Sequence, residues 1–157
     1  MASAHIKIMA GAFCLFTGLC AGAAETPRKN AEAVWFASWD KAAVAAKESG
    51  KPILADFTGS DWCGWCIRLD DEVFATQEFG AWARQNVILL KLDFPHQKEQ
   101  DAELKKQNSS LAQKYGIRGF PTVLFLDAEG TPLGKAGYLP GGPCKWLECA
   151  GQLLTKK

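Results

Sequence analysis

The feature that most constrains the fold of this chain is a pair of cysteines, Cys63 and Cys66, placed between an apolar run and a helical pattern. The run from Ile53 to Thr58 is short, mostly apolar and closed by glycine and serine, which predicts a strand buried on both faces. After the pair, apolar residues recur at helical spacing as far as Phe74. The chain is therefore expected to build a strand-to-helix junction around the two cysteines.

This spacing suits reversible disulfide chemistry. Two cysteines at positions i and i+3 of a helix start lie about one turn apart, with Cα atoms roughly 5 Å from each other, which a disulfide tolerates. Unpaired amides and the helix dipole favour a thiolate at the helix N-terminus. We therefore expect Cys63 to attack a target disulfide and Cys66 to resolve the mixed disulfide.

Other interpretations of the pair are a static disulfide, half of a zinc site, or two core thiols. A zinc site needs about four ligands. The other candidates, His96 and the pair Cys144 and Cys149, lie in unrelated segments, and the sequence has no second C-x-x-C. We expect no metal, and no cofactor besides the redox-active disulfide itself.

The remaining segments alternate between helical and strand patterns. Further helices are predicted from Trp35 to Gly50, from Thr76 through Trp82, from Gln97 to Tyr115 with a loosened part around 108–110, and from Pro143 through Leu153. Further strands are predicted at Val87 to Phe94, Thr122 to Leu126 and Leu133 to Tyr138. This order gives one βαβ half with parallel strands and one hairpin half, which predicts an α/β fold.

The first two dozen residues have the pattern of a secretory signal peptide. Lys7 precedes an apolar stretch of about 14 residues, and small residues follow up to Ala24. The stretch is short for a bilayer span, although an uncleaved N-terminal anchor is the alternative. We expect a signal peptide at 1–24, a flexible polar segment at 25–33, and one domain at 34–157.

Export would place the protein in the periplasm or outside the cell, where disulfides persist. Cleavage would remove Cys14 and Cys20 and leave four of the six cysteines. Without Lys7, the 18 basic residues become 17 against 17 acidic ones, which is not the charge pattern of a nucleic-acid-binding protein. Membrane contact is expected only through the N-terminal segment, if it is uncleaved.

A second cysteine pair lies near the C-terminus. Cys144 and Cys149 would face directions about 140° apart on a continuous helix, so they are not expected to bond each other there. They are either two small, half-buried residues or a disulfide at a frayed helix start.

Two separated motifs resemble the thioredoxin superfamily, and exported bacterial thioredoxin-like proteins in particular. The motifs are Asp56-Phe57-Thr58-Gly59-Ser60-Asp61-Trp62-Cys63-Gly64-Trp65-Cys66 and Gly116-Ile117-Arg118-Gly119-Phe120-Pro121-Thr122. The resemblance covers roughly Val34 to the C-terminus. It implies a thioredoxin fold, with a central mixed four- to five-stranded sheet flanked by helices and a C-x-x-C pair that faces a cis-proline loop.

The resemblance also implies residue roles. Cys63 matches the nucleophile, Cys66 the resolving thiol and Trp62 the aromatic residue beside them. Pro121 matches the cis-proline, and Phe120 matches the residue whose backbone meets an extended substrate.

Further supporting roles follow from the same resemblance. Asp56 resembles the buried acid that assists deprotonation of the resolving cysteine, although it could instead be a solvent-facing strand end. Lys91 matches the lysine near that acid. Gly64 and Trp65 occupy the two positions that tune the redox potential.

The sequence departs from thioredoxin itself at three points. One extra residue lies between Asp56 and Cys63, which could displace the acid. Trp65 stands where thioredoxin has proline, and Ile67 where it has lysine. The direction of electron flow is therefore open.

The resemblance implies a protein dithiol–disulfide oxidoreductase. Its expected partners are exported protein substrates with cysteines and a redox protein that recycles the disulfide, with no nucleic acid. The alternative is a thioredoxin-fold binding or chaperone module whose disulfide is structural, and metal delivery is a third, weaker hypothesis.

Overall fold

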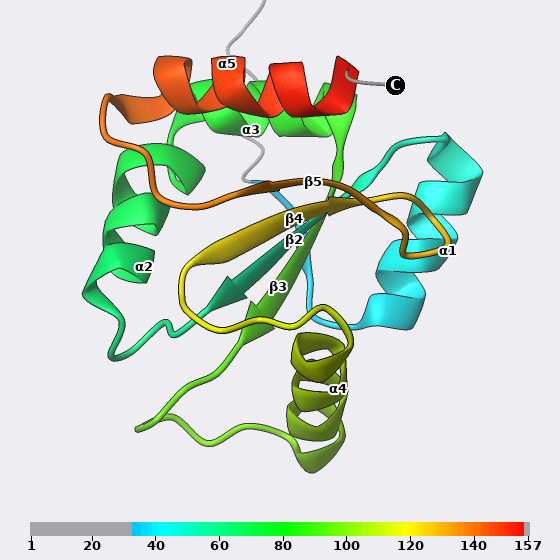
Figure 1. The fold of residues 1–157 in the computed structure, drawn as a ribbon, viewed down its shortest axis with the longest axis vertical. Coiled ribbons are helices and arrows are strands. Elements are labelled where there is room, and N and C mark those ends of the chain that lie inside the picture. Colours follow the sequence, from blue (N-terminus) through cyan, green and yellow to red (C-terminus); the bar gives the residue numbers. More distant parts are fainter. Residues whose placement is uncertain (1–32, 156–157) are drawn as a thin grey trace, which may run out of the picture.

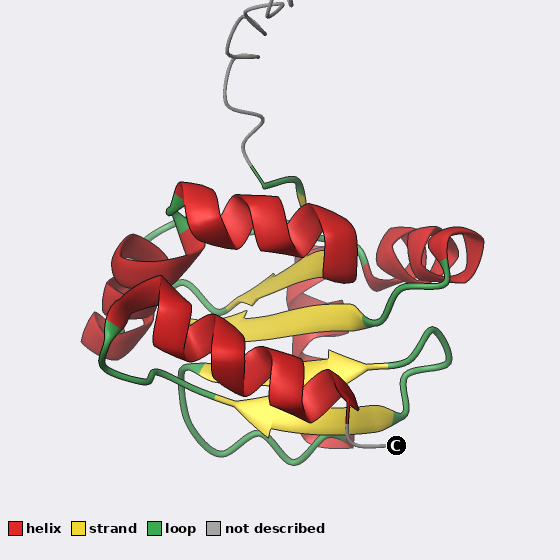
Figure 2. Ribbon diagram, turned by 90° about the horizontal axis from the view of Figure 1, so that it is seen from above, coloured by secondary structure: helices red, strands yellow, loops and turns green. Residues whose placement is uncertain are grey.

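A computed structural model describes residues 33–155 as one sheet with helices on both faces (Figures 1 and 2). The predicted signal peptide and residues 25–32 lie outside the described residues. Within 33–155, no helix is both long enough and apolar enough to cross a membrane.

The sheet has five strands in the order β1-β3-β2-β4-β5. Their bounds are β1 Trp35–Phe36, β2 Ile53–Thr58, β3 Ile88–Asp93, β4 Thr122–Leu126 and β5 Pro132–Ala136. β1, β3 and β2 run parallel, whereas β4 is antiparallel to both β2 and β5. The mixed sheet and the thioredoxin fold that the sequence predicts are thus confirmed.

Helices pack on both faces of the sheet. Their bounds are α1 Trp39–Ser49, α2 Gly64–Leu69, the π-helical turn η1 Asp70–Phe74, α3 Gln77–Asn86, α4 Ala102–Lys114 and α5 Gly142–Thr155. In Figure 1, α3 and α5 run alongside each other at one side of the sheet, while α4 lies at the opposite side.

Every residue of β2 is buried, as its apolar sequence predicts. Alternate residues of a strand point to opposite faces. Leu54 accordingly joins the core cluster that includes Phe79 of α3 and Trp146 of α5, whereas Phe57 joins the cluster on the other face. The central strand therefore positions whatever follows it between two packed layers.

The first predicted helix is wrong at its start. Trp35 and Phe36 form a strand that pairs with Leu89 and Leu90 of β3. The helix begins only at Trp39, because the Ser38 side chain caps it by accepting the amide of Lys41 at 3.5 Å. Aromatic residues suit a half-buried strand, and here the strand stands so close to the helix that the two share one apolar pattern in the sequence.

The predicted helix from Gln97 to Tyr115 is too long and is not loosened. It begins at Ala102, where the Asp101 side chain accepts the amides of Glu103 and Leu104. Asn108 is buried and donates to the main-chain oxygen of Asp93 at 2.9 Å instead of disturbing its own helix. A polar residue that competes with helix backbone in isolation is here used for a tertiary hydrogen bond.

Candidate active site

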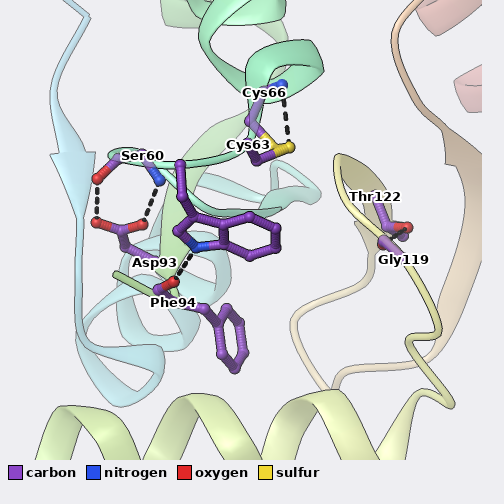
Figure 3. Close-up of a disulfide and its surroundings, with 8 residues drawn as sticks. Ser60, Cys63, Cys66, Asp93, Phe94, Gly119 and Thr122 are labelled. Atoms are coloured by element: carbon purple, nitrogen blue, oxygen red, sulfur yellow. Dashed lines mark hydrogen bonds between the residues drawn. A yellow bond between two sulfur atoms is a disulfide. The ribbon is translucent and has the colours of Figure 1, made fainter. Parts of the chain in front are cut away.

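Cys63 and Cys66 form a disulfide at the start of α2, with their Cα atoms 5.2 Å apart. Cys63 is the N-cap of the helix, and its Sγ accepts the backbone N–H of Cys66 at 3.3 Å (Figure 3). Both cysteines are buried. The predicted strand-to-helix junction and bonded pair are therefore present.

The loop before the disulfide is fixed to the end of β3. Ser60 donates its backbone N–H and its hydroxyl to the two carboxylate oxygens of Asp93, at 2.9 and 2.6 Å (Figure 3). The indole N–H of Trp62 donates to the main-chain oxygen of Phe94 at 2.7 Å. These bonds hold the residues just before Cys63 against a neighbouring parallel strand.

Asp61 ties the same loop to the segment after β3. Its carboxylate accepts the backbone N–H groups of His96, Gln97 and Lys98 at 2.9, 2.8 and 3.0 Å. These bonds lower the pKa of Asp61 to about 2. Asp61 is therefore ionised at neutral pH, when it holds the loop most firmly.

Trp62 brings the disulfide segment and the proline loop together. Its ring stacks on His96, with centroids 4.2 Å apart and planes 2° from parallel, and meets Phe120 edge-on at 5.8 Å. The Phe120–Pro121 peptide bond is cis. Trp62 and Phe120, which the resemblance places on opposite sides of the site, are in direct contact.

An open groove of about 460 Å³ lies beside the disulfide segment. It is lined by Trp65, Arg68, Phe120, Pro121, Tyr138 and Pro140. Trp65 is 56% exposed, which is unusual for the largest apolar side chain and places its ring within reach of a partner molecule. The two positions between the cysteines thus contribute an exposed glycine and one wall of the groove.

A compact polar cluster supports that wall. Arg68 donates to Glu72 at 2.6 Å, and the Tyr138 hydroxyl donates to the other oxygen of Glu72 at 2.8 Å. The guanidinium lies 5.8 Å from the ring centre of Trp65 and 5.4 Å from that of Tyr138. The hydrogen bonds from Arg68 and Tyr138 lower the pKa of Glu72. Arg68, the one cation among the described residues that line the groove, is therefore paired, and the groove offers mainly ring and aliphatic surface.

Asp56 is a buried acid and not a solvent-facing strand end. Its residue is 3% exposed, and its Oδ1 has no hydrogen-bond partner. Burial raises its pKa to about 7, Lys91 opposes this rise, and Asp70 and Asp93 add to it. Asp56 on β2 and Lys91 on β3 stand opposite each other in the strand register. The acid and the lysine that the resemblance implies are thus brought together.

Several residues that build the site were not predicted from the sequence. Ser60, Asp61 and Asp93 hold the loop, and Arg68 and Tyr138 form the groove wall. A serine and an aspartate after a strand are a recognisable turn signal. Their partners lie 33 to 37 positions away, however, and no spacing in the sequence indicates them.

Two further expectations from the sequence concern a metal site and the second cysteine pair, Cys144 and Cys149. Across residues 33–155, no group of three or more His, Cys, Asp or Glu side chains is arranged to hold a metal ion. Cys144 is exposed, Cys149 is partly buried, and both are free thiols. Their spacing on α5 agrees with the expectation that they do not bond each other there, but Cys144 is more exposed than the half-buried position expected for it.

The sheet order, the disulfide at the strand-to-helix junction and the cis-proline beside the same groove define the class of thioredoxin-fold dithiol–disulfide proteins. The chain belongs to the thioredoxin-like family, whose domain profile matches residues 39–148.

Curated relatives carry the same segment within longer proteins. The chain is 39% identical over 110 residues to the disulfide bond reductase DsbH of Chlamydia pneumoniae, covering 70% of this chain and 66% of DsbH. It is 28% identical to the thioredoxin-related protein DsbJ of the same organism, covering 70% of this chain and 32% of DsbJ. It is 32% identical to the thiol:disulfide interchange protein DsbD of Vibrio vulnificus (strain CMCP6), covering 62% of this chain and 16% of DsbD.

Solved structures agree on the fold. A structure described as DsbH oxidoreductase has a TM-score of 0.78 and 34% identity, covering 84% of this chain and 91% of that chain. A thioredoxin from Thermus thermophilus has a TM-score of 0.60 at 16% identity, covering 80% of this chain and 89% of that chain, a likeness of fold alone.

Proposed function

We propose that this chain is a thiol–disulfide oxidoreductase that acts on exported proteins, with Cys63 as the nucleophile and Cys66 as the resolving thiol. The observation that carries this proposal is the Cys63–Cys66 disulfide, which caps a helix directly beside an open apolar groove. A structural disulfide needs no such groove. The working direction is reduction, since the 39% identical relative is a disulfide bond reductase.

The reductive cycle starts from the dithiol form. The Cys63 thiolate attacks one sulfur of a substrate disulfide, forms a mixed disulfide and releases one substrate thiolate, which takes up a proton. The Cys66 thiol then loses its proton and attacks Cys63 Sγ, which releases the second substrate thiolate. Two electrons have passed to the substrate, and Cys63 and Cys66 are again a disulfide. A dithiol partner protein must reduce it before the next cycle.

Asp56 is the proton acceptor for Cys66 in this proposal. It lies on β2, the strand that leads into the disulfide loop, and its buried Oδ1 has no hydrogen-bond partner. Because its pKa is about 7, it exchanges a proton easily near neutral pH. Lys91 supports the charged form of Asp56, while Trp62, Gly64 and Trp65 shape the surface around the attacking sulfur.

The groove holds an extended segment of the substrate next to its reacting cysteine. Phe120 and Pro121 of the cis-proline loop line this groove together with Trp65 and Tyr138. Arg68 is paired with Glu72, and the other described residues that line the groove offer ring and aliphatic surface, so bulky apolar residues that flank a substrate cysteine fit best.

Tyr138→Ala is expected to raise KM for a protein disulfide about tenfold, because loss of a ring contact costs about 1.4 kcal/mol of binding. The rate with glutathione disulfide, which is too small to fill the groove, should change much less. Tyr138→Phe is the matched control, since it keeps the ring and removes only the hydroxyl, which donates to Glu72. An unchanged KM for Tyr138→Ala would mean that the groove does not bind the protein substrate.

Export is proposed from the N-terminal sequence. Residues 1–24 have the order of a charged start, an apolar stretch and small residues that directs proteins to the secretory pathway, with the thioredoxin-like domain at 34–157. The protein would then act in the periplasm or outside the cell. N-terminal sequencing of the exported protein tests this, and an intact Met1 would contradict cleavage.

Trapping of the mixed disulfide tests the proposed function directly. In a Cys66→Ser variant, Cys63 can still attack but nothing resolves the product, so a covalent adduct with a reducible protein substrate should accumulate and disappear on addition of dithiothreitol. Mass spectrometry should place the adduct on Cys63. If the protein is instead a binding module with a structural disulfide, no adduct forms.

A further inference from the structure

Lys91 is bonded to the carboxylate of Asp70 and not to that of Asp56, its partner in the strand register. Its Nζ is 3.0 Å from Oδ1 of Asp70 and 5.1 Å from the ring centre of Trp35. Its strand neighbour Asp56 carries the unpaired Oδ1. Among the described ion pairs, none joins Lys91 to Asp56. Lys91, the cation whose charge acts on Asp56, is thus bonded to another carboxylate.

The strand register makes this arrangement possible. Asp56 and Lys91 follow Leu54 and Leu89 by two positions, so all four side chains point to the same face of the sheet. Leu54 and Leu89 belong to the core cluster beneath η1 and α5. Lys91 can therefore reach either toward Asp56 within the sheet or upward to the turn above it.

Asp70 reaches Lys91 from the first position of η1. The α-helix that begins at the disulfide gives way at this point to a π-helical turn, Asp70–Phe74. Such turns change the direction in which successive side chains point and occur frequently at functional sites. Asp71, the next residue, is exposed and has no ion pair among the described residues, so the interaction is specific to Asp70.

We propose that Asp70 is a positioning residue of the active site, which holds Lys91 away from Asp56 and so sets the pH at which this buried acid can take a proton from Cys66. The inference rests on the proposed function, because it assigns a consequence to the proton transfer proposed above. In that step the S–H bond of Cys66 breaks, its proton moves to a carboxylate oxygen of Asp56, and the Cys66 thiolate attacks Cys63 Sγ.

Three charged groups act on the pKa of Asp56, and loss of the Asp70 charge would lower this pKa in two ways. The groups concerned are Lys91, which stabilises its charged form, and Asp70 and Asp93, which oppose it. Asp93 is already occupied by two hydrogen bonds from Ser60. Removal of the Asp70 charge would therefore act twice, since it ends a repulsion and frees Lys91 to approach Asp56.

The test compares Asp70→Asn with the parent protein by two independent measurements. Carbon-13 NMR titration of the Asp56 carboxyl should show its pKa fall by about one pH unit, the size of effect that a new opposite charge at close range produces. The rate of mixed-disulfide resolution, measured against pH, should shift its rising limb toward lower pH by a similar amount. Asp70 is partly exposed, with a side-chain exposure of 47%, so the amide is expected to be tolerated.

Three further variants keep the test specific. Asp71→Asn should leave both curves unchanged, Asp70→Glu should restore the parent curves, and Lys91→Met should move the pKa of Asp56 upward. An unchanged Asp56 pKa in Asp70→Asn would overturn the inference. If that pKa falls while the resolution rate keeps its pH profile, the pairing inference stands and the proposed role of Asp56 as proton acceptor is contradicted.

Discussion

Cys63→Ser is expected to lower turnover of disulfide substrates by roughly three orders of magnitude or more, as loss of a covalent nucleophile does in other enzymes. A serine hydroxyl stays protonated near neutral pH and cannot replace the thiolate. The fold should remain, because the core clusters on both faces of the sheet do not depend on a sulfur at this position.

Insulin reduction with dithiothreitol as the electron source measures this effect. Cys144→Ser is the matched control, since Cys144 is an exposed free thiol on α5 and should be dispensable. Circular dichroism should show the same secondary structure in both variants. Substantial insulin reduction by the Cys63→Ser protein would mean that another group performs the attack.

Asp56→Asn is expected to stabilise the protein at alkaline pH. The pKa of Asp56 is about 7 in the folded protein against 3.8 for an unperturbed aspartate. Between these values the unfolded chain loses its proton while the folded chain keeps it, so the free energy of unfolding falls as pH rises and levels off above pH 7. A shift of roughly three units corresponds to about 4 kcal/mol, which is the upper limit of the gain for a neutral amide.

Urea unfolding of the oxidised proteins at pH 4 and pH 8 measures this gain. The parent and the Asp56→Asn variant should differ little at pH 4, which is close to the pKa of aspartate in the unfolded chain, and by about 2–4 kcal/mol at pH 8. Asp71→Asn changes a charge at the surface and should show no such pH-dependent gain. Equal differences at the two pH values would mean that Asp56 is not held in its protonated form by burial.

The sequence predicts the central part of the fold well because the patterns there are strong. The run from Ile53 to Thr58 is continuous and apolar, and it is the fully buried β2. Thr76 caps α3 by accepting the amide of Phe79, as its residue type suggests. The disulfide pair lies where strand and helix patterns meet, so its place in the fold follows from the same evidence.

The predictions of secondary structure that were wrong concern segments in which tertiary contacts override the local preference of the residues. Trp35 and Phe36 form a strand because β3 offers an edge to pair with. Asn108 stays within a regular helix because the main chain at Asp93 satisfies its side chain. Neither partner is apparent from the residues next to it in sequence.

Some residues of the candidate site could likewise be predicted from the sequence, and others could not. The cysteines, Trp62 and Pro121 follow from motifs that a resemblance can transfer. The pairing of Lys91 with Asp70 does not, since it depends on the π-helical turn and on strand register together. The groove wall likewise depends on Tyr138, which follows β5 and which no motif singles out.

The reduction potential of the Cys63–Cys66 pair tests the central claim most directly. Equilibration of the protein with glutathione buffers, followed by alkylation and mass spectrometry, gives the value. A working pair should have a potential between about −120 and −270 mV and should equilibrate quickly. A potential below about −300 mV with slow exchange is typical of a structural disulfide and would contradict the account.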